Sequence, residues 1–382
     1  MNAMENRKST TGKVIVLLAA LALVAVTNAC AQGTGSDLSG AQAGQGLPGS
    51  QNGNDSPGAQ AGQGLPQTQV RYDLLNTAIT ISIYEETDAG VFDDVFDRIY
   101  SIEQAMSTTL AHSEISTIAA MAGKTPVILS DETYAVVKAA YDISVESDGA
   151  FNLAIGPLVK LWGINTASPR VPGLTEIEIA QNMSDFGDVI LSDTEKSVFL
   201  TREGMSIDLG AIAKGYAGDA AAEIIRDHGI SSALLDLGGN IVTIGCKPDG
   251  TGWRIGLRNP IIGESGYIGV LTVQDKAIVT SGGYERNFVS GGRFYHHIFD
   301  GKTGYPSESG LLSVTIISDS STEADKLSTV AFVLGLDAGM DYLLRFYEDV
   351  DAVFITEGFE IYVTPGIKDS FVITDDRFSL AG

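Results

Sequence analysis

An α+β fold is predicted for this chain of 382 residues. Residues 78–84 alternate between apolar and polar side chains as a half-buried strand does, helical spacing follows, and short apolar strands dominate the second half. Strands and helices do not alternate strictly, so mixed sheets with helices packed on them are expected. With 44% apolar and 19% charged residues, the composition is typical of a globular protein.

The first half of the folded part contains two predicted helices after the strand at 78–84. Apolar residues recur at helical spacing over 92–105. A second helix is expected over 130–147, because Ser130 is a favourable N-cap, acidic residues follow it in the first turn, and Asp148-Gly149 ends the pattern.

Strands are more frequent in the second half. An alanine-rich helix is expected over 211–227, and an apolar strand over 232–237 ends in two glycines. Gly335 is a suitable C-cap for a helix over 322–334. A further helix is expected over 338–347, and further strands are expected at 253–257, 267–273, 277–280, 312–318, 352–356 and 360–363.

The N-terminus has the pattern of a secretory signal. Three basic residues precede an apolar run over 14–26, and Cys30 follows it directly after Thr27-Asn28-Ala29. Cys30 stands where a bacterial lipoprotein signal places the lipidated thiol, although Thr27 occupies a position that is usually leucine. The alternative is a simple secretion signal with an incidental cysteine. The run is too short for a spanning helix.

A low-complexity segment follows. The sequence GAQAGQGLP at 40–48 recurs at 58–66 within a stretch rich in glycine, alanine and glutamine, which is typical of a flexible tether. Its root-mean-square reach is roughly 35 Å. We therefore predict a signal peptide at 1–29, a lipidated Cys30 with a tether over 30–70, and a folded domain over 71–382. Cys246 is the only other cysteine, so the domain has no disulfide.

The net charge of −24 excludes some partners. Such acidity argues against nucleic acid binding and against a polybasic contact with a membrane surface. Membrane attachment is therefore expected from lipid at Cys30 and not from charge.

Residues 207–219, IDLGAIAKGYAGD, place a lysine at the start of a helix. Free amides at a helix N-terminus together with Lys214 form a plausible phosphate site. The alternative is a strand-to-helix turn with an ordinary surface lysine. The segment is not a P-loop, because GxxxxGK is absent.

Asp325 and Thr329 lie four residues apart and share one face of a predicted helix. A carboxylate and a hydroxyl are hard oxygen ligands, which suit Mg²⁺. The alternative is an acidic first turn favoured by the helix dipole, and spacing alone does not decide between the two.

His296 and His297 are adjacent in a predicted strand, so they point to opposite faces and at most one enters any given site. A neutral imidazole near a phosphoanhydride can take a proton from an attacking hydroxyl. The alternative for either residue is a structural role. Two histidines without HExxH or CxxC do not make a zinc site.

Taken together, the motifs resemble the ApbE family of FAD:protein FMN transferases. The matching segments, in chain order, are MSTTLAHSEIS at 106–116, GAFNLAIGPLVKLWGI at 149–164, IDLGAIAKGYAGD at 207–219, TSGGYERNF with YHHIFDGKTGYP at 280–306, and EADKLST at 323–329. The resemblance implies a T-fold-like single catalytic unit with an FAD cleft between two subdomains. It also implies Mg²⁺-dependent transfer of FMN from FAD to a threonine of an acceptor flavoprotein, with release of AMP.

The resemblance also implies roles for particular residues. His297 matches the catalytic histidine, and Lys214 and Asp325 are expected to act beside it. The metal would be held by the Ala211 carbonyl, Asp325 and Thr329, and FAD would be contacted by Leu75, Thr109, Ala150, Phe151, Asn152, Asp208, Lys214 and Ile298.

The sequence departs from the family pattern at a few positions. Thr109 stands where a tyrosine that stacks on the flavin is common, and Leu75-Asn76-Thr77 replaces Met-Gly-Thr. Asn152 replaces a frequent aspartate, and Ser328 replaces an additional acidic ligand. Weaker flavin retention and altered metal affinity are expected.

Two other activities compete with transfer to a protein. Loosely held FAD can be hydrolysed to FMN and AMP with water as the acceptor, or the chain can be a non-catalytic lipoprotein that binds FAD. In each case the lipid anchor would place the domain on the extracytoplasmic face of a bacterial cell membrane.

Overall fold

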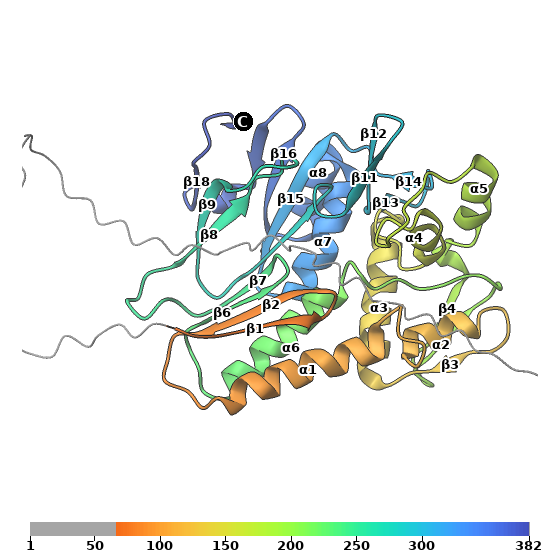
Figure 1. The fold of residues 1–382 in the computed structure, drawn as a ribbon, viewed down its shortest axis with the longest axis horizontal. Coiled ribbons are helices and arrows are strands. Elements are labelled where there is room, and N and C mark those ends of the chain that lie inside the picture. Colours follow the sequence, from red (N-terminus) through yellow and green to blue (C-terminus); the bar gives the residue numbers. More distant parts are fainter. Residues whose placement is uncertain (1–65, 382) are drawn as a thin grey trace, which may run out of the picture. The chain divides into compact units, whose positions relative to one another are not determined.

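The structure is a computed structural model that describes residues 66–381. Its largest sheet has nine strands in the order β1-β2-β6-β7-β10-β15-β16-β17-β19 (Figure 1). Neighbouring strands are antiparallel except for the last pair, β17 with β19. The strands are β1 (Gln67–Leu74), β2 (Thr77–Ile83), β6 (Ala233–Leu237), β7 (Asn240–Ile244), β10 (Ala277–Gly282), β15 (Leu311–Ser318), β16 (Asp351–Thr356), β17 (Glu360–Val363) and β19 (Ser379–Leu380).

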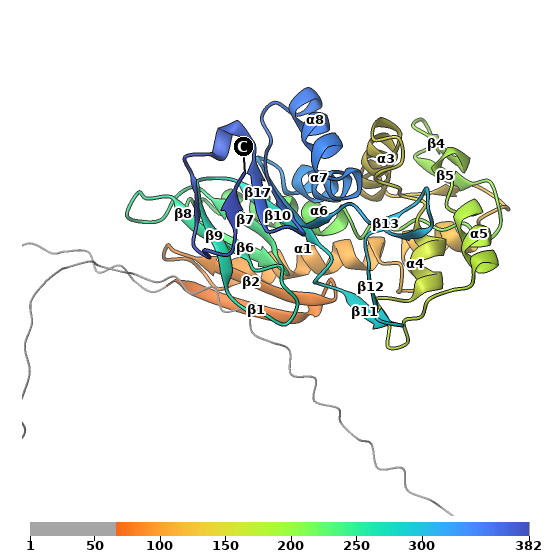
Figure 2. The ribbon, with the colours of Figure 1, turned by 90° about the horizontal axis from the view of Figure 1, so that it is seen from above.

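Helices cover one face of this sheet (Figures 1 and 2). Helix α6 (Ala213–Asp227) packs between α1 (Gly90–Met106) and α7 (Ser321–Leu334), and α7 lies against β10 and β15. Helix α8 (Leu336–Phe346) packs on α7. The main core lies between these helices and the sheet. It buries Ile79, Ile81 and Ile83 completely, as the alternation of residues 78–84 predicted.

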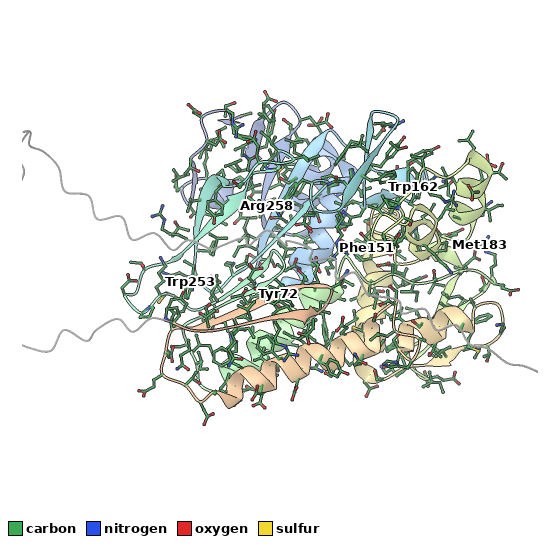
Figure 3. All side chains as sticks on the ribbon, viewed as in Figure 1. Tyr72, Phe151, Trp162, Met183, Trp253 and Arg258 are labelled. Carbon is green, nitrogen blue, oxygen red and sulfur yellow. The ribbon has the colours of Figure 1, made fainter. Side chains whose placement is uncertain are left out.

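A small three-stranded sheet covers the other face. Strands β8 (Trp253–Arg258), β9 (Tyr267–Val273) and β18 (Phe371–Ile373) form it in the order β18-β9-β8. A second core, which includes Trp253, fills the space between the two sheets (Figure 3). Central strands of the large sheet are therefore buried on both faces, which explains why they are almost continuously apolar.

A second region is formed mainly by the chain between α1 and α6. It contains α2 (Glu114–Ala120), α3 (Asp131–Glu146), α4 (Gly156–Trp162), α5 (Leu174–Asn182) and a sheet in the order β3-β5-β4, whose strands are β3 (Val127–Ile128), β5 (Ser197–Leu200) and β4 (Val189–Ser192). Two hairpins from the second half of the chain join it: β11 (Asn287–Ser290) with β12 (Arg293–His296), and β13 (Phe299–Asp300) with β14 (Tyr305–Pro306).

Trp162 of α4 packs against both hairpins and joins them to the second region (Figure 3). Its indole Nε1 donates a hydrogen bond to the Gly304 carbonyl at 3.0 Å. Its ring centroid lies 5.3 Å from that of Tyr295 and 5.4 Å from that of Tyr305. Segments from 142 residues apart in the sequence are thus joined in one aromatic cluster.

The α+β prediction is confirmed, and the predicted helices and strands are present with small shifts at their ends. Ser130 caps α3 as expected, since its side chain accepts from the Thr133 amide. One boundary was wrong: β1 begins at Gln67, inside the range 30–70 assigned to the tether. Most side chains of this edge strand are exposed, so the hydrophobic pattern did not reveal it.

Several predictions about the N-terminus, including the signal peptide at 1–29 and the lipidated Cys30, lie outside the described residues. Within 66–381, none of the helices is both long and apolar enough to cross a bilayer.

Two glycines let α6 and α7 approach very closely. A Cβ atom at Gly215 would lie 2.3 Å from the Ser321 carbonyl oxygen and 2.7 Å from the Asp325 Cβ. A Cβ atom at Gly218 would meet the Ser321 Oγ at 2.9 Å and the Val242 Cγ2 at 3.1 Å. Position 215 therefore faces rigid backbone, whereas position 218 faces side chains that can shift.

We predict that Gly215→Ala destabilises the domain although alanine favours helices. Overpacking of this kind typically costs about 1–3 kcal/mol, which exceeds the gain of about 1 kcal/mol from helix propensity. Gly218→Ala is the matched control in the same helix and should have the smaller effect. Urea unfolding measures both. A Gly215→Ala variant as stable as the wild type would show that α7 does not need this close approach.

Candidate active site

The turn before α6 is anchored to the second region. The Asp208 amide donates to the Leu153 carbonyl at 2.9 Å, which joins residues 207–210 to the segment that follows α3. The Asp208 Oδ1 accepts from the Gly210 amide at 2.7 Å. Burial raises the pKa of the Asp208 carboxyl, while this hydrogen bond and the positive charge of Arg286 act in the opposite direction.

Asp325 is a buried polar residue of the α6–α7 contact and is 4% exposed. Its Oδ2 accepts from the Gly215 amide at 2.8 Å, and its Oδ1 lies 3.6 Å from the Lys214 Nζ. The Lys214 Nζ also donates to the Asn240 Oδ1 at 2.6 Å. The first turn of α6, the second turn of α7 and the start of β7 therefore meet at one lysine.

The same contact leaves a backbone oxygen available. Gly215 is the fourth residue after Ala211, so the Gly215 amide would donate to the Ala211 carbonyl if the helical pattern extended to that residue. It donates to Asp325 instead. The Ala211 carbonyl, the Asp325 carboxylate and the Thr329 hydroxyl are hard oxygen donors of the kind that suit a divalent cation.

The Ser328 hydroxyl forms hydrogen bonds within the protein. Its hydroxyl donates to the Asp325 carbonyl at 2.9 Å and lies 2.7 Å from the Ser281 Oγ. The Ser281 Oγ is also 3.4 Å from the Thr329 Oγ1. Ser328 therefore positions its neighbours through its hydroxyl. Between residues 66 and 381, no group of three or more His, Cys, Asp or Glu side chains is arranged to hold a metal ion.

The two histidines differ in their hydrogen bonds. Both ring nitrogens of His296 are used, because its Nε2 pairs with the Ser307 carbonyl at 2.9 Å and its Nδ1 accepts from the Ile298 amide at 3.2 Å. The ring also lies edge-on to Phe332, with centroids 5.4 Å apart. His296 is therefore a structural residue.

His297 has one ring nitrogen without a hydrogen-bond partner among residues 66–381. Its Nδ1 pairs with the Arg286 carbonyl at 3.3 Å, and since a carbonyl only accepts, the proton is on Nδ1 and Nε2 is the basic nitrogen. Burial, together with the positive charge of Arg286, lowers the pKa of His297 to about 3. The imidazole is therefore neutral at physiological pH.

The turn expected to contact FAD follows α3. Gly149 adopts φ 79°, and both Ala150 and Phe151 are buried. The Asn152 Nδ2 donates to the Ser184 carbonyl at 2.7 Å, and its Oδ1 accepts from the Ala154 amide at 2.9 Å. Both polar groups of Asn152 thus hold the loop itself, which explains why an uncharged amide is accommodated here.

A pocket of about 240 Å³ opens beside this turn. The Lys302 Nζ pairs with the Asp148 Oδ2 at 2.6 Å at its edge. It is lined by Asp148, Gly149, Asn152, Gln181, Asn182, Ser184, Asp185, Phe186, Arg202, Gly301 and Lys302.

Leu75 and Asn76 form the two-residue turn between β1 and β2. Both have positive φ, 50° and 54°, which corresponds to a type I′ hairpin. Asparagine tolerates this conformation better than most residues, so Asn76 is a reasonable replacement for the usual glycine. Leucine does not, and the Leu75 backbone is held by a hydrogen bond from its amide to the Glu103 Oε1 at 3.1 Å.

Thr109 and Ile298 occupy different environments. Thr109 follows α1 and is exposed, and its hydroxyl lies 3.0 Å from the Ser107 Oγ. Ile298 is buried beside the two histidines. Among the described contacts, none joins Leu75 or Thr109 to the Lys214–Asp325 pair.

The structure thus brings together Lys214, Asp325 and the turn of α7 that carries Thr329, whereas the FAD-binding assignments stay predictions.

Sequence reasoning missed two residues of this site. Asn240 follows two glycines at a strand end, a signal that indicates a tight turn but not a partner for Lys214. Glu285 lies against Gly239. Burial raises the pKa of the Glu285 carboxyl, although the positive charges of Lys214 and Arg286 oppose this effect.

A larger groove of about 850 Å³ runs along the β11–β12 hairpin and the chain after β14. His296, Tyr284 and Phe359 line it, and His297 does not. Its wall includes the ion pair between Arg293 and Glu308.

Comparison with known proteins is consistent across sequence and structure. A relative from Klebsiella pneumoniae (strain 342), named FAD:protein FMN transferase, is 38% identical over 307 residues, which is 80% of this chain and 95% of the relative. A protein of the same name from Treponema pallidum (strain Nichols) is 35% identical over 325 residues, 80% of this chain and 89% of that protein.

A solved structure is also similar to this chain. The ApbE protein from Thermotoga maritima superposes with a TM-score of 0.74 at 31% identity and covers 80% of this chain and 99% of its own. The model of the ApbE family matches residues 75–354. This chain therefore belongs to the ApbE family.

Proposed function

We propose that this chain transfers FMN from FAD to a threonine hydroxyl of an acceptor flavoprotein and releases AMP. The observation that carries the proposal is the arrangement of Lys214, Asp325 and the Ala211 carbonyl, which the Gly215 amide does not use, where α6 meets α7. Two relatives that cover most of this chain are named for the same reaction.

Phosphoryl transfer requires positive charge beside the pyrophosphate as its bridging bond breaks. Lys214 supplies one positive charge, and the N-terminus of α6 supplies amide dipoles of the same sign. Asp325, Thr329 and the Ala211 carbonyl would hold Mg²⁺, which would offset the negative charge that develops on the phosphate oxygens. Asp325 alone supplies a carboxylate, so such an ion would keep several waters or phosphate oxygens.

His297 would accept the proton of the attacking hydroxyl. In the proposed reaction the threonine oxygen forms a bond to the phosphorus of the FMN half, the bond from that phosphorus to the oxygen of AMP breaks, and the threonine proton moves to the His297 Nε2. A neutral imidazole is needed for this step. Negative phosphates nearby would raise the low pKa of His297 and make it a better base when FAD is bound.

The test is an incubation of the folded domain with FAD, Mg²⁺ and an acceptor flavoprotein subunit that bears a threonine motif. Mass spectrometry should find the acceptor heavier by one FMN, on threonine, with an equal amount of AMP. If no credible acceptor is modified while AMP still appears, the enzyme is a hydrolase.

FAD pyrophosphatase activity is the second candidate, and Thr109 favours it. This exposed residue offers no aromatic ring to stack on the flavin. Loosely held FAD would then turn over with water. AMP release without any acceptor decides between the two: a negligible rate beside fast transfer excludes the hydrolase. A non-catalytic lipoprotein would retain FAD unaltered when Mg²⁺ is added.

We also propose that the domain is tethered by lipid to the extracytoplasmic face of a bacterial membrane. The signal-like N-terminus, Cys30 and the repeated tether support this localisation. The acceptor would then be a subunit exposed on the same side.

Replacement of the anchor gives a direct prediction. A Cys30→Ser variant should move from the membrane fraction to the soluble fraction and lose incorporated fatty acid, because serine lacks the thiol. Cys246→Ser is the matched control and should stay at the membrane. If the two variants distribute alike, attachment does not depend on Cys30.

Asp325→Asn separates metal binding from folding. The Asn side-chain oxygen can still accept from the Gly215 amide, but the negative charge is lost, so we expect Mg²⁺-dependent turnover to fall by roughly 10²-fold or more. Asp319→Asn, at a residue whose side chain is 78% exposed, is the control and should be neutral. Turnover and Mg²⁺ titration measure the effect. Wild-type Mg²⁺ dependence in Asp325→Asn would remove Asp325 from the metal site.

The two histidines should give opposite phenotypes. His297→Ala should reduce transfer by roughly 10²-fold while FAD binding and the melting temperature change little. His296→Ala should lower the melting temperature, because two buried hydrogen bonds and the contact with Phe332 are lost. Transfer assays, FAD titration and thermal unfolding test both. A larger catalytic defect in a stably folded His296→Ala would identify His296 as the base.

A further inference from the structure

Asn240 is a buried polar residue to which neither the motifs nor the family resemblance gives a role. It is the first residue of β7 and directly follows Gly238 and Gly239, whose φ values of 66° and 95° form the tight turn from β6. The residue is 2% exposed. Its Oδ1 accepts from the Lys214 Nζ at 2.6 Å, the shorter of the two polar contacts described for that ammonium.

Lys214 fixes the orientation of the Asn240 amide. An ammonium only donates, so the amide oxygen and not the amide nitrogen must face it. The Asn240 Nδ2 is then directed into the protein, where it is buried and has no hydrogen-bond partner among the described residues. An unsatisfied buried donor is unfavourable, because it has lost its hydrogen bonds to water and gained none in the protein. Asn240 therefore provides an acceptor for the Lys214 ammonium, while its own Nδ2 donor has no partner among the described residues.

A neutral acceptor has a specific advantage at this position. The Lys214 ammonium lies 3.6 Å from the Asp325 Oδ1, beyond ordinary hydrogen-bond distance. Without Asn240, the ammonium would be free to close on Asp325 and take up a carboxylate oxygen. A carboxylate at position 240 would instead neutralise the lysine charge. An amide oxygen holds the ammonium outside hydrogen-bond distance of Asp325, with which it still forms an ion pair. It also adds no further negative charge beside the lysine, whose charge already acts on Asp236 and Glu285.

We propose that Asn240 is a positioning residue that holds Lys214 for the pyrophosphate of FAD and keeps Asp325 available for a cation. This inference rests on the proposed function, because it assumes that Lys214 binds the pyrophosphate. Asn240 acts only through Lys214 and need not touch the substrate.

The first experiment measures FAD affinity without Mg²⁺, by flavin fluorescence, in Asn240→Leu. Leucine is similar in size and has no donor to leave unsatisfied, so the melting temperature should stay the same or rise. The dissociation constant for FAD should increase about tenfold, as expected when a hydrogen bond to a charged group is lost. Thr243→Val, a buried polar replacement on the same strand, should leave FAD affinity unchanged.

A double-mutant cycle tests whether Asn240 acts through the lysine. In a Lys214→Gln background, Asn240→Leu should have no further effect on FAD affinity. Additive effects, or unchanged affinity in the single variant, would overturn the inference. If Asn240→Leu does not fold, Asn240→Asp replaces it: the carboxylate should still pair with Lys214 but lower FAD affinity, and unchanged affinity would again overturn the inference. A wild-type domain that does not bind FAD would instead refute the proposed function.

Discussion

The hydrogen bond from the Gly215 amide to Asp325 is the interaction on which the site depends. It exists because Gly215 has no side chain, so α6 and α7 approach until the backbone of one helix meets the carboxylate of the other. The bond orients Asp325, removes the Gly215 amide from the Ala211 carbonyl, and places Lys214 on the same turn. One close helix contact thus supplies both the oxygen ligands and the positive charge that the proposed chemistry requires.

The surrounding residues hold this geometry from several directions. Asn240 fixes the Lys214 ammonium from the sheet side, and Ser281 with Ser328 orients the turn that carries Thr329. His296 uses both ring nitrogens to fix the chain that presents His297. The polar groups of this region are therefore mostly committed to one another, which indicates a preorganised site and not one that forms only around its ligand.

Sequence patterns predicted most of the main sheet and its helices, because apolar periodicity reports burial directly. They missed β1, whose side chains are largely exposed. Of the small hairpins that pack on Trp162, which are held by distant partners, they indicated only the strand that ends at His296. Motif spacing placed Asp325 and Thr329 on one helix face, and the structure agrees. It could not identify Asn240, because an asparagine after two glycines is equally consistent with an ordinary turn, and only the fold brings it to Lys214.

The most direct test of the central claim is a crystal structure of the domain with FAD and Mn²⁺, which is visible by anomalous scattering and takes oxygen ligands as Mg²⁺ does. The ion is expected at Asp325, Thr329 and the Ala211 carbonyl, with the pyrophosphate against Lys214 and the Lys214–Asn240 hydrogen bond intact. An ion bound elsewhere, or a pyrophosphate distant from Lys214, would contradict the assignment of this helix contact as the active site.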